Sequence, residues 1–369
     1  MNVLKFEDSC YGCGVCAISC PRHIINMIQD KQGFYRPTII DTNKCTDCEV
    51  CVKACAFNYT QHMQSKNDSK KEAYAAWSLD DDIRHRCSSG GIAYEISKQA
   101  IDAGYNVCAV RYNGEEQKAE HYIAHTIEEL TDSIGSKYIQ SYTLNGFKEI
   151  DFKQKHLVIG TPCQIDSLRR LIQLKKAEDN FILVDFFCHG TPSKLVWDKY
   201  IEEFKQKYGT PLTASWRNKK TGWHDSWVIE LKYNSKEMIK CYNSKKSNGD
   251  LFYRLFFGHA CLNKACYDNC KYKLLNSSAD IRIGDLWGNK FANNNEGVSA
   301  VLSLTQKGKE LLTSLSNVQL EKEEIDIVLG GQMRDAPKRP RSHKFVSKAL
   351  SSPLKLKWID LFSRVINKL

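Results

Sequence analysis

Two identical runs of cysteines constrain this chain more than any other feature. Both runs follow C-x2-C-x2-C-x3-C spacing, the first at Cys10, Cys13, Cys16 and Cys20 and the second at Cys45, Cys48, Cys51 and Cys55. Three cysteines spaced in this way wrap a loop so that their sulfurs converge on one corner of an iron–sulfur cubane, while the fourth is set apart. The spacing therefore predicts two [4Fe-4S] clusters.

Zinc sites and disulfides are the alternatives for these thiols. Zinc sites usually combine C-x2-C pairs across a longer loop rather than runs of four. The chain begins Met-Asn-Val-Leu-Lys without the pattern of a signal peptide, and its longest strongly apolar run, residues 181–187, is too short to span a bilayer. We therefore expect a cytoplasmic globular protein, in which sixteen cysteines favour metal ligation over disulfides.

The N-terminal stretch resembles a bacterial two-cluster ferredoxin domain. In such domains the fourth cysteine of each run ligates the other cluster. The resemblance implies one cluster on Cys10, Cys13, Cys16 and Cys55, and another on Cys45, Cys48, Cys51 and Cys20. Pro21 after Cys20 fits the bacterial pattern, whereas Ala56 after Cys55 departs from it.

The charge balance argues only weakly for nucleic-acid binding. The formal net charge is +10, but each [4Fe-4S] core with four thiolates carries about −2, so two clusters lower the balance to about +6. We expect no nucleic-acid partner. The basic excess is local, because residues 336–359 contain no acidic side chain.

This basic C-terminal tail, residues 336–369, ends in a stretch with helical apolar spacing. It could form an amphipathic helix that makes peripheral contact with an anionic membrane surface. The alternative is a helix that docks on the protein body and exposes a basic face to solvent. The apolar residues are Leu354, Leu356, Trp358, Ile359, Leu361, Phe362, Val365 and Ile366.

Between the cysteine runs and this tail, the chain alternates predicted strands and helices. Residues 61–72 are polar and lysine-rich, which indicates a linker. A strand is predicted at 73–78, a helix from Ile92 after the turn Ser88-Ser89-Gly90-Gly91, and a buried strand at 105–112. A turn of this kind can offer backbone N–H groups to an anion, although a plain capping turn would look the same.

Two later turns share one design. Predicted strands at 156–159 and 181–187 end in Gly160-Thr161-Pro162-Cys163 and in Cys188-His189-Gly190-Thr191-Pro192. In both, threonine can cap a helix and proline can occupy its first position. This alternation predicts parallel strands with a right-handed crossover. Cys163 and Cys188 then lie at the carboxyl ends of neighbouring strands, where open α/β sheets bind ligands.

Three further cysteines, Cys261, Cys266 and Cys270, follow within ten residues of one another. With Cys163 and Cys188 they offer five thiols, of which a cubane needs four. Residues Trp216, Arg217, Trp223 and His224 line either a pocket or the core. We interpret the remaining cysteines as packed thiols; they are Cys87, Cys108 and Cys241.

Taken in order, several of these motifs resemble the coenzyme F420 hydrogenase/dehydrogenase β-subunit family. They are Ser88-Ser89-Gly90-Gly91, Gly135-Ser136-Lys137-Tyr138, Gly160-Thr161-Pro162-Cys163-Gln164, Cys188-His189-Gly190, Cys266 with Cys270, and Ile283-Gly284-Asp285-Leu286-Trp287-Gly288. The resemblance covers roughly residues 73–345. It implies FAD beside a third [4Fe-4S] cluster.

The resemblance also implies which residues hold these cofactors. The inner cluster would be ligated by Cys163, Cys188, Cys266 and Cys270, with Cys261 as the substitute because the last pair is spaced C-x3-C here. The residues expected to contact FAD are Ser88, Ser89, Gly90, Gly91, Gly135, Ser136, Lys137, Tyr138 and Gln140.

We therefore expect an α/β protein with five segments. A ferredoxin-like α+β domain (1–60) and a linker (61–72) precede an α/β flavin-binding core with a mostly parallel sheet. The core consists of the family's N-terminal part (73–153, flavin-binding) and its C-terminal part (154–335, with the inner cluster and the flavin and substrate site). The basic tail (336–369) completes the chain.

The predicted function is that of an iron–sulfur flavoprotein oxidoreductase that passes electrons between ferredoxin-type clusters and FAD. Reduced ferredoxin or F420H2 is the expected donor, coenzyme F420 is a candidate substrate, and His189 and His224 are candidate general acids. The alternatives are an electron-transfer subunit without its own substrate and an accessory protein of a cell-surface polysaccharide pathway. The expected partners are a ferredoxin or a reductase or dehydrogenase subunit and a small-molecule donor or acceptor, in an oligomer.

Overall fold

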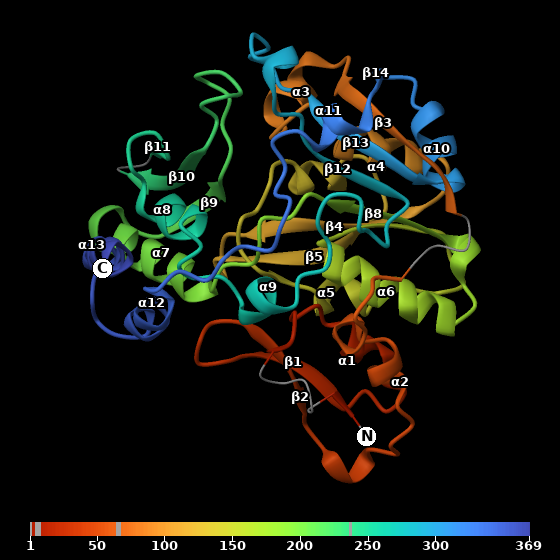
Figure 1. The fold of residues 1–369 in the computed structure, drawn as a ribbon, viewed down its shortest axis with the longest axis horizontal. Coiled ribbons are helices and arrows are strands. Elements are labelled where there is room, and N and C mark those ends of the chain that lie inside the picture. The colour runs from red at the N-terminus through yellow and green to blue at the C-terminus, as the bar shows by residue number, and fades with distance from the viewer. Residues whose placement is uncertain (1, 4–8, 64–67, 236–237) are drawn as a thin grey trace.

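The computed structural model describes residues 2–3, 9–63, 68–235 and 238–369. Figure 1 shows three parts: an N-terminal block at one end, a large sheet with helices, and a smaller unit that holds the C-terminal helix. The N-terminal block is an antiparallel strand pair with short helical segments, as expected for a ferredoxin-like domain. Its elements are α1 (Val15–Ser19), β1 (Ile25–Gln29), β2 (Tyr35–Ile39), η2 (Thr42–Lys44), α2 (Val50–Lys53) and η3 (Ala56–Asn58).

The large sheet has nine strands in the order β14-β3-β13-β12-β8-β7-β4-β5-β6. Its centre, β4, β7, β8 and β12, is parallel, as the crossover motif predicts. Both flanks contain antiparallel pairs, so the sheet as a whole is mixed. The strands are β3 (Asp68–Ser78), β4 (Asn106–Asn113), β5 (Lys118–Ala124), β6 (Ser141–Tyr142), β7 (His156–Ile159), β8 (Phe181–Phe186), β12 (Ile281–Asp285), β13 (Ser299–Thr305) and β14 (Val318–Glu323).

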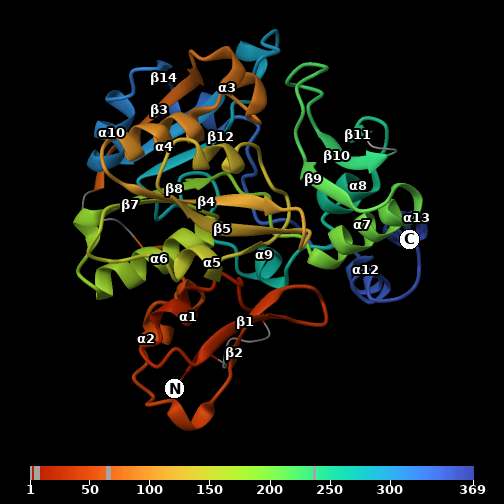
Figure 2. The ribbon, with the colours of Figure 1, turned by 180° about the vertical axis from the view of Figure 1, so that it is seen from behind.

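Helices cover both faces of this sheet, because alternate residues of each central strand face opposite sides. In β7, for example, Leu157 packs with α4 and α10, whereas Val158 packs with α5 and α6. In both views α5 and α6 lie between the sheet and the N-terminal block (Figure 1 and Figure 2). The segments are α3 (Asp81–Arg86), α4 (Ile92–Asp102), η4 (Glu129–Ser133), α5 (Leu144–Phe147), α6 (Pro162–Leu174), η5 (Glu178–Asn180), α9 (Lys264–Asp268), η6 (Asn289–Phe291), α10 (Gln306–Thr313) and α11 (Ile325–Leu329).

The smaller unit surrounds a three-stranded antiparallel sheet of order β11-β10-β9. Its core is aromatic, with Trp197, Trp216, Phe252 and Tyr253 fully buried. None of the helices within the described ranges combines the length and apolar character needed to cross a bilayer. The elements are α7 (Lys194–Tyr208), β9 (Pro211–Ser215), β10 (Val228–Ser235), β11 (Met238–Lys245), α8 (Leu251–Phe257), α12 (His343–Leu350) and α13 (Leu356–Lys368).

Two local predictions need correction. Strand β3 begins at Asp68, inside the stretch 61–72 that we expected to be a linker; residues 64–67 of that stretch lie outside the described residues. The Thr-Pro turn is a helix start only once. Thr161 and Gln164 form a capping box at α6 with Pro162 at its first position, but α7 is capped by Ser193, whose side chain accepts the Leu195 N–H.

Candidate functional site

One large cavity of about 460 Å³ opens at the carboxyl ends of the parallel strands β7 and β8. Its wall includes residues from both segments that we expected to contact FAD, and also Cys163, Cys188 and His189. Its volume lies within the range of about 300 to 1,000 Å³ typical of small-molecule and cofactor sites. The fold therefore brings motifs far apart in the sequence to one place.

The Ser88–Gly91 turn forms one part of this wall. Gly91 caps α4 with a φ of +87°, a conformation that favours glycine. The Gly90 N–H donates to the Ser299 hydroxyl oxygen at 3.0 Å, and Ser89 donates to the Val298 carbonyl at 2.7 Å. Gly90 is thus hydrogen-bonded within the protein and, unlike its neighbours Ser88, Ser89 and Gly91, does not line the cavity.

The 135–140 loop lies directly beside this turn, because the Ser136 N–H donates to Ser88 Oγ at 2.8 Å. Lys137 Nζ donates to the carbonyls of Asp132, Ser133 and Ile134 at 3.2, 2.8 and 3.1 Å. Burial lowers the pKa of Lys137 to about 7. In this arrangement Lys137 ties the loop to η4, and its three donors are all used.

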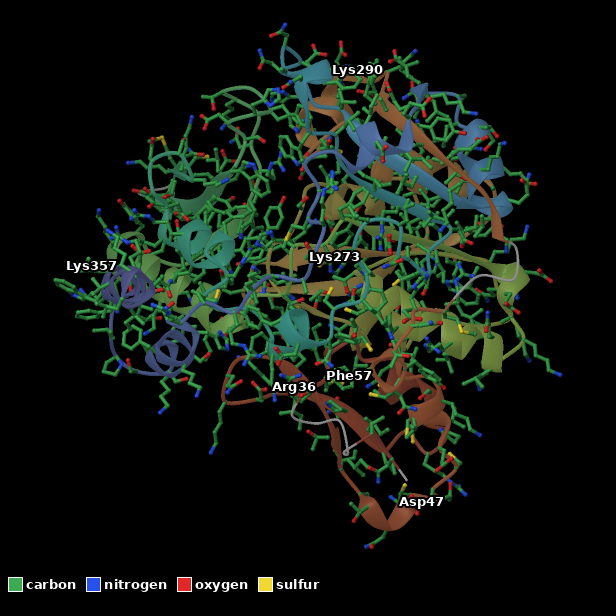
Figure 3. All side chains as sticks on the ribbon, in the orientation of Figure 1. Arg36, Asp47, Phe57, Lys273, Lys290 and Lys357 are labelled. Atoms are coloured by element: carbon green, nitrogen blue, oxygen red, sulfur yellow. The ribbon has the colours of Figure 1, made fainter. Side chains whose placement is uncertain are left out.

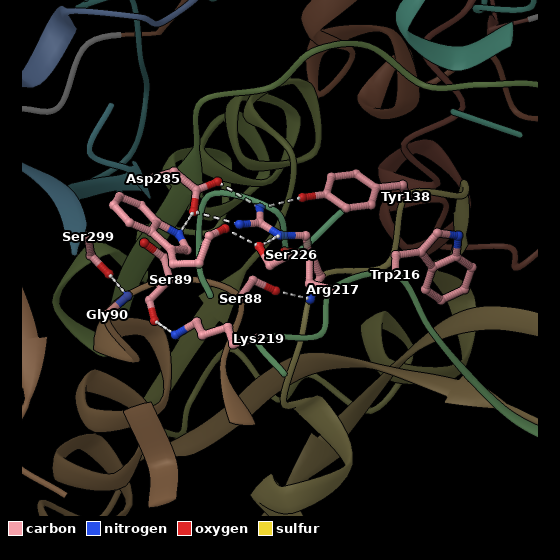
Figure 4. Close-up of polar contacts among 12 residues, drawn as sticks. Ser88, Ser89, Gly90, Tyr138, Trp216, Arg217, Lys219, Ser226, Asp285 and Ser299 are labelled. Carbon is pink, nitrogen blue, oxygen red and sulfur yellow. Dashed lines mark hydrogen bonds and ion pairs between the residues drawn. The ribbon is translucent and has the colours of Figure 1, made fainter. Parts of the chain in front are cut away.

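Figure 4 shows the polar contacts that Arg217 and Lys219 make with the 135–140 loop and the Ser88–Gly91 turn. Arg217 donates to Asp285 at 2.9 Å and to the Tyr138 hydroxyl at 3.4 Å. Burial lowers the pKa of Arg217, but the Asp285 carboxylate and Tyr138 more than offset this, so its net pKa is raised and it stays cationic. Lys219 Nζ donates to the Ser89 carbonyl at 2.5 Å and supports the neighbouring turn. These buried cations fix the position of both wall segments.

The four residues that we assigned to either a pocket or the core do not line the cavity. Trp216 and Trp223 are fully buried in core clusters, and Arg217 is buried against Asp285. His224 is exposed beside the Trp223 and Trp287 rings. These side chains are therefore structural rather than part of the pocket.

The two candidate general acids differ in position. His189 lines the cavity and packs its ring against Phe256, Phe257 and His259 with centroid distances of 4.8, 5.2 and 4.7 Å. Burial lowers the pKa of His189 to about 3, so the ring is neutral near pH 7. His224 lies outside the cavity wall.

The exposed end of the N-terminal block brings together Cys20, Cys45, Cys48 and Cys51, which line a cavity of about 20 Å³. Burial raises the pKa of Cys51, and the nearby thiols of Cys20 and Cys48 add to this effect. Cys48 is exposed to solvent. Asp47, between Cys45 and Cys48, lies at the tip of the block remote from the large sheet (Figure 3).

The other four thiols of the block are buried next to α6. Burial raises the pKa of Cys55 strongly, and Cys13 and Cys10 raise it further, which places the fourth cysteine of the second run beside the first run. The Gly12 N–H donates to Cys10 Sγ at 3.1 Å, the kind of contact that stabilises a cluster thiolate. Cys13 Sγ donates to Ser167 Oγ of α6 at 3.3 Å.

The inner thiols Cys163, Cys188, Cys266 and Cys270 also lie near one another. Burial raises the pKa of Cys266 to about 12, and Cys188 and Cys270 contribute to the rise. The Thr191 N–H donates to Cys266 Sγ at 3.4 Å. Cys261 is buried within the aromatic core of the smaller unit, whereas Cys266 lies at the edge of that core. Because Cys188 and Cys270 lie near Cys266, Cys266 is better placed than Cys261 to share a cluster with Cys188.

Sequence reasoning missed the cation beside these thiols, Lys273, which also lines the cavity. In the sequence, its position only three residues after Cys270 is the feature that could have indicated a cation near the inner thiols. Within the described residues, no three His, Cys, Asp or Glu side chains are arranged to hold a single metal ion. A cubane places irons and sulfides between its thiolates, so its ligands stand farther apart than ligands of one ion.

Tyr11 connects the N-terminal block to the inner thiols. Its hydroxyl donates to the Asn269 carbonyl at 2.6 Å, and its ring lies 5.9 Å from that of Tyr272. Cys163 and Cys270 pack against the same small apolar cluster. Tyr11 and Gly12 also reach the wall of the large cavity. The block therefore contacts both the inner thiols and the predicted flavin site.

Comparison with known proteins identifies the family. The model of the coenzyme F420 hydrogenase/dehydrogenase β-subunit N-terminal domain matches residues 73–147, and that of its C-terminal domain matches residues 153–327. A 4Fe-4S dicluster domain matches residues 9–59.

Two curated relatives are similar over part of their length. A coenzyme F420-dependent sulfite reductase from Methanocaldococcus jannaschii is 27% identical over 175 residues, 46% of this chain and 26% of that protein. A coenzyme F420 hydrogenase β subunit from Methanococcus voltae is 27% identical over 145 residues, 36% of this chain and 51% of that protein. The chain thus spans about half or less of the relatives it matches.

A solved structure titled as a xenon derivatization of the F420-reducing [NiFe] hydrogenase complex from Methanosarcina barkeri is also similar. The TM-score is 0.48 at 15% identity, covering 83% of this chain and 93% of that chain. The family assignment rests on the sequence models, which match most of the chain in the expected order. The chain belongs to the coenzyme F420 hydrogenase/dehydrogenase β-subunit family and carries an N-terminal 4Fe-4S dicluster domain.

Proposed function

We propose that this protein is an iron–sulfur flavoprotein oxidoreductase that passes electrons between [4Fe-4S] clusters and FAD. The observation that carries the proposal is the large cavity, whose wall combines both predicted FAD segments with Cys163 and Cys188. A bound flavin would then lie next to an inner cluster. Bound FAD supplies the exchange between two-electron hydride chemistry and one-electron transfer, which clusters alone do not provide.

Three sets of four cysteines are the proposed cluster ligands. The proximity of Cys55 to Cys10 and Cys13 supports the crossed-over assignment, as does the small cavity lined by Cys20 with the second run. The position of Cys266 supports its choice over Cys261. The proposed sets are Cys10, Cys13, Cys16 and Cys55; Cys20, Cys45, Cys48 and Cys51; and Cys163, Cys188, Cys266 and Cys270.

The order of these sets in space supports an electron path. The second set includes exposed Cys48, which follows Asp47 at the tip of the N-terminal block, where a redox partner can approach. The set with Cys13 is buried against α6, and Tyr11 leads from it to Cys163 and Cys270. Electrons would pass between the tip and the flavin cavity through the two buried sets, in a direction set by the relative potentials.

The residues of the cavity wall would bind and orient FAD. The Ser88 turn and the 135–140 loop form one continuous wall through the Ser136–Ser88 hydrogen bond. Lys273, which lines the cavity, would supply positive charge for the pyrophosphate, whereas Lys137 holds the 135–140 loop in place through its bonds to three carbonyls. His189, neutral near pH 7, would act as an apolar or hydrogen-bonding wall rather than as a charged acid.

Reduced ferredoxin or F420H2 is the proposed donor. The names of the two relatives connect coenzyme F420 with a sulfite reductase and with a hydrogenase, which supports F420H2 as a hydride donor to the flavin. A ferredoxin-type donor would instead deliver electrons at the exposed tip of the N-terminal block. Electrons from these two donors would therefore enter the same path at opposite ends, from F420H2 at the flavin and from ferredoxin at the N-terminal block.

Anaerobic purification with iron, sulfide and flavin quantitation tests the cofactor proposal. We expect about twelve irons for three cubanes, and one FAD per chain. Eight irons after careful reconstitution would remove the inner cluster from the proposal. Chains without flavin after incubation with FAD would remove the flavin site.

The variant Cys188→Ser tests the path. We expect it to lose the inner cluster and keep FAD, so that in stopped flow F420H2 still reduces the flavin while the outer clusters stay oxidised. The matched control is Cys241→Ser, since Cys241, which we expected to be a packed thiol, is instead exposed on β11 and lies outside the cavity wall. Transfer to the outer clusters at the wild-type rate in Cys188→Ser would show that the inner cluster is not on the path.

An electron-transfer subunit without its own substrate is the second candidate. The thiol set at the tip, in which Cys48 is exposed, favours docking to another redox protein, and one relative is named as a subunit. Turnover of the purified chain with F420H2 and an artificial acceptor distinguishes the two. Flavin reduction by F420H2 without a partner favours the enzyme, and its absence in a flavin-loaded chain favours the subunit.

A further inference from the structure

Helix α13 has two apolar faces, of which only one is packed. Leu356 and Ile359 are buried, and they face α7, α8 and α12 together with Asp360 and Ser363. These positions are spaced three and four residues apart, so they lie on one side of the helix. The helix thus docks on the protein body, which was one of the two alternatives for the tail.

The opposite face carries a second stripe at helical spacing. Trp358, Leu361, Phe362 and Val365 are 43%, 37%, 44% and 49% exposed. At 100° per residue this stripe lies across the helix axis from Leu356 and Ile359. A helix that is apolar on opposite sides normally has a partner on each. In the part of the chain that the structure describes, the Phe345 ring of α12 meets the edge of this face at Phe362, with a centroid distance of 6.0 Å, and the rest of the face is open to solvent.

The charge around this stripe is positive. Lys355, Lys357, Arg364 and Lys368 are exposed beside it. The helix has a single acidic residue, Asp360, which is buried and paired with Arg254 and Arg364 at 3.3 and 3.1 Å. Lys357 Nζ also lies 5.1 Å from the Trp358 ring centroid. The outward surface of α13 is therefore apolar with a rim of cations.

This surface lies away from the cofactor site. Figure 1 places α13 at the outer edge of the smaller unit, and Figure 3 shows Lys357 projecting outward there, far from Lys273 in the cavity wall. A flat partner could cover the stripe without blocking the cavity or the exposed Cys48 at the tip of the N-terminal block.

We infer that the outward face of α13 binds the surface of an anionic lipid bilayer. Trp and Phe side chains favour the boundary between headgroups and acyl chains, and the surrounding cations match anionic headgroups. A second copy of the chain fits this face less well, because a two-fold contact would bring the same cations together. The inference is independent of the redox function proposed above.

Flotation of the full chain with vesicles tests the inference. We expect binding to vesicles of equal parts phosphatidylglycerol and phosphatidylcholine, weaker binding at high salt, and little binding to phosphatidylcholine alone. The double variant Trp358→Ser, Phe362→Ser should bind at least tenfold more weakly. Lys357→Gln should weaken binding about fivefold.

The matched control is Met238→Ser, Ile239→Ser, which removes two apolar side chains that are 63% and 65% exposed on β11 of the same unit. This control should bind vesicles like the wild type. The visible spectrum of each variant checks that the cofactors and the fold are retained. Equal vesicle binding by the wild type and the Trp358, Phe362 variant would overturn the inference.

Sizing and sedimentation of the same proteins without lipid test the other occupants. A wild-type dimer that the Trp358, Phe362 variant converts to a monomer would assign the stripe to a second copy and overturn the lipid proposal. Equal binding to neutral and anionic vesicles would also contradict it, because the cations would then have no role.

Discussion

Lys273 Nζ donates a hydrogen bond to the backbone carbonyl of Cys188 across 2.7 Å. The same side chain lines the large cavity, so one positive charge stands between the inner thiols and the space proposed for FAD. A cation in a buried site stabilises negative charge nearby far more than it would in water. Lys273 is therefore placed to favour the reduced state of the proposed inner cluster and of the proposed FAD.

Replacement of Lys273 should lower a reduction potential without removing a ligand. We expect Lys273→Met to retain twelve irons and to shift the potential of the inner cluster downward by an amount on the order of tens of millivolts. Anaerobic redox titration followed by electron paramagnetic resonance measures this. Lys290→Met is the control, since Lys290 lies at the far end of the molecule (Figure 3) and pairs with Glu323.

An unchanged inner-cluster potential in Lys273→Met would contradict this electrostatic role. Loss of the cluster would indicate instead that Lys273 holds the Cys188 backbone in place. Lys273→Arg distinguishes the two outcomes, because it keeps the charge while changing the geometry of the hydrogen bond.

The contact between the N-terminal block and the 135–140 loop gives a second prediction. The Tyr35 N–H donates to Gln140 Oε1 at 3.0 Å, and a Cβ at Gly12 would collide with Gln140 Nε2 and lie 2.6 Å from the Tyr35 carbonyl oxygen. We expect Gly12→Ala to destabilise the protein by about 1 to 3 kcal/mol more than the control described next, through overpacking. Anaerobic thermal unfolding measures the difference.

Gly104→Ala is the matched control for Gly12→Ala. Gly104 has a φ of +80°, close to the +73° of Gly12, but nothing lies within 4 Å of a Cβ at Gly104. Both variants carry a comparable backbone penalty, and only Gly12→Ala adds the collision. Equal unfolding temperatures for the two would show that the block and the loop are not tightly packed.

Much of the fold follows from local pattern in the sequence. Strands β7 and β8 form where short apolar runs end in glycine or cysteine turns, and Pro162 starts α6 because its missing N–H costs nothing there. The antiparallel flanks were not predicted. The connection between β4 and β5, for example, is short and contains no helix, so it lacks the strand–helix–strand pattern on which the prediction of parallel strands depends. Local pattern therefore predicts the parallel centre better than the edges.

The candidate site was less predictable, since tertiary contacts decide the role of its polar residues. In the sequence Arg217 could line either a pocket or the core, and only the fold shows that it forms a buried ion pair with Asp285, far along the chain. Lys137 looks free for phosphate, yet its donors meet three carbonyls of the preceding turn. The docking of the N-terminal block through Tyr11 had no sequence signal.

A buried histidine predicts a pH dependence of stability. His121 is fully buried, with its ring 4.9 Å from that of Phe147, and burial lowers its pKa from 6.5 to about 3. Between these values the unfolded chain binds more protons than the folded one, so stability falls as pH falls below about 6.5. Between pH of about 7.5 and about 5.5, His121 should therefore lower the free energy of unfolding by roughly 1 to 1.5 kcal/mol.

His121→Leu should reduce this difference in unfolding free energy between the two pH values by that amount. Denaturant unfolding of the apo chain under reducing conditions at the two pH values measures it. His85→Leu, at an exposed position on α3, controls for removal of a histidine as such. A difference between the two pH values that is unchanged in His121→Leu would contradict the argument.

The last prediction concerns Tyr11, whose side chain lies between the N-terminal block and the inner thiols. Tyr11→Phe removes the hydroxyl and its hydrogen bond to the Asn269 carbonyl, at a cost of about 0.5 to 1.5 kcal/mol, and retains the ring contacts with Phe57 and Tyr272. Tyr11→Ala also removes the ring and loosens the packing between the two proposed cluster sites.

If the ring sets the spacing of these sites, Tyr11→Phe should transfer electrons from the N-terminal clusters to the flavin at nearly the wild-type rate, and Tyr11→Ala should be at least tenfold slower with all irons retained. Stopped flow with reduced ferredoxin or dithionite follows flavin reduction directly. Equal slowing in both variants would assign the effect to the hydroxyl rather than the ring. A wild-type rate in Tyr11→Ala would place the electron path elsewhere along the interface between the N-terminal block and α6.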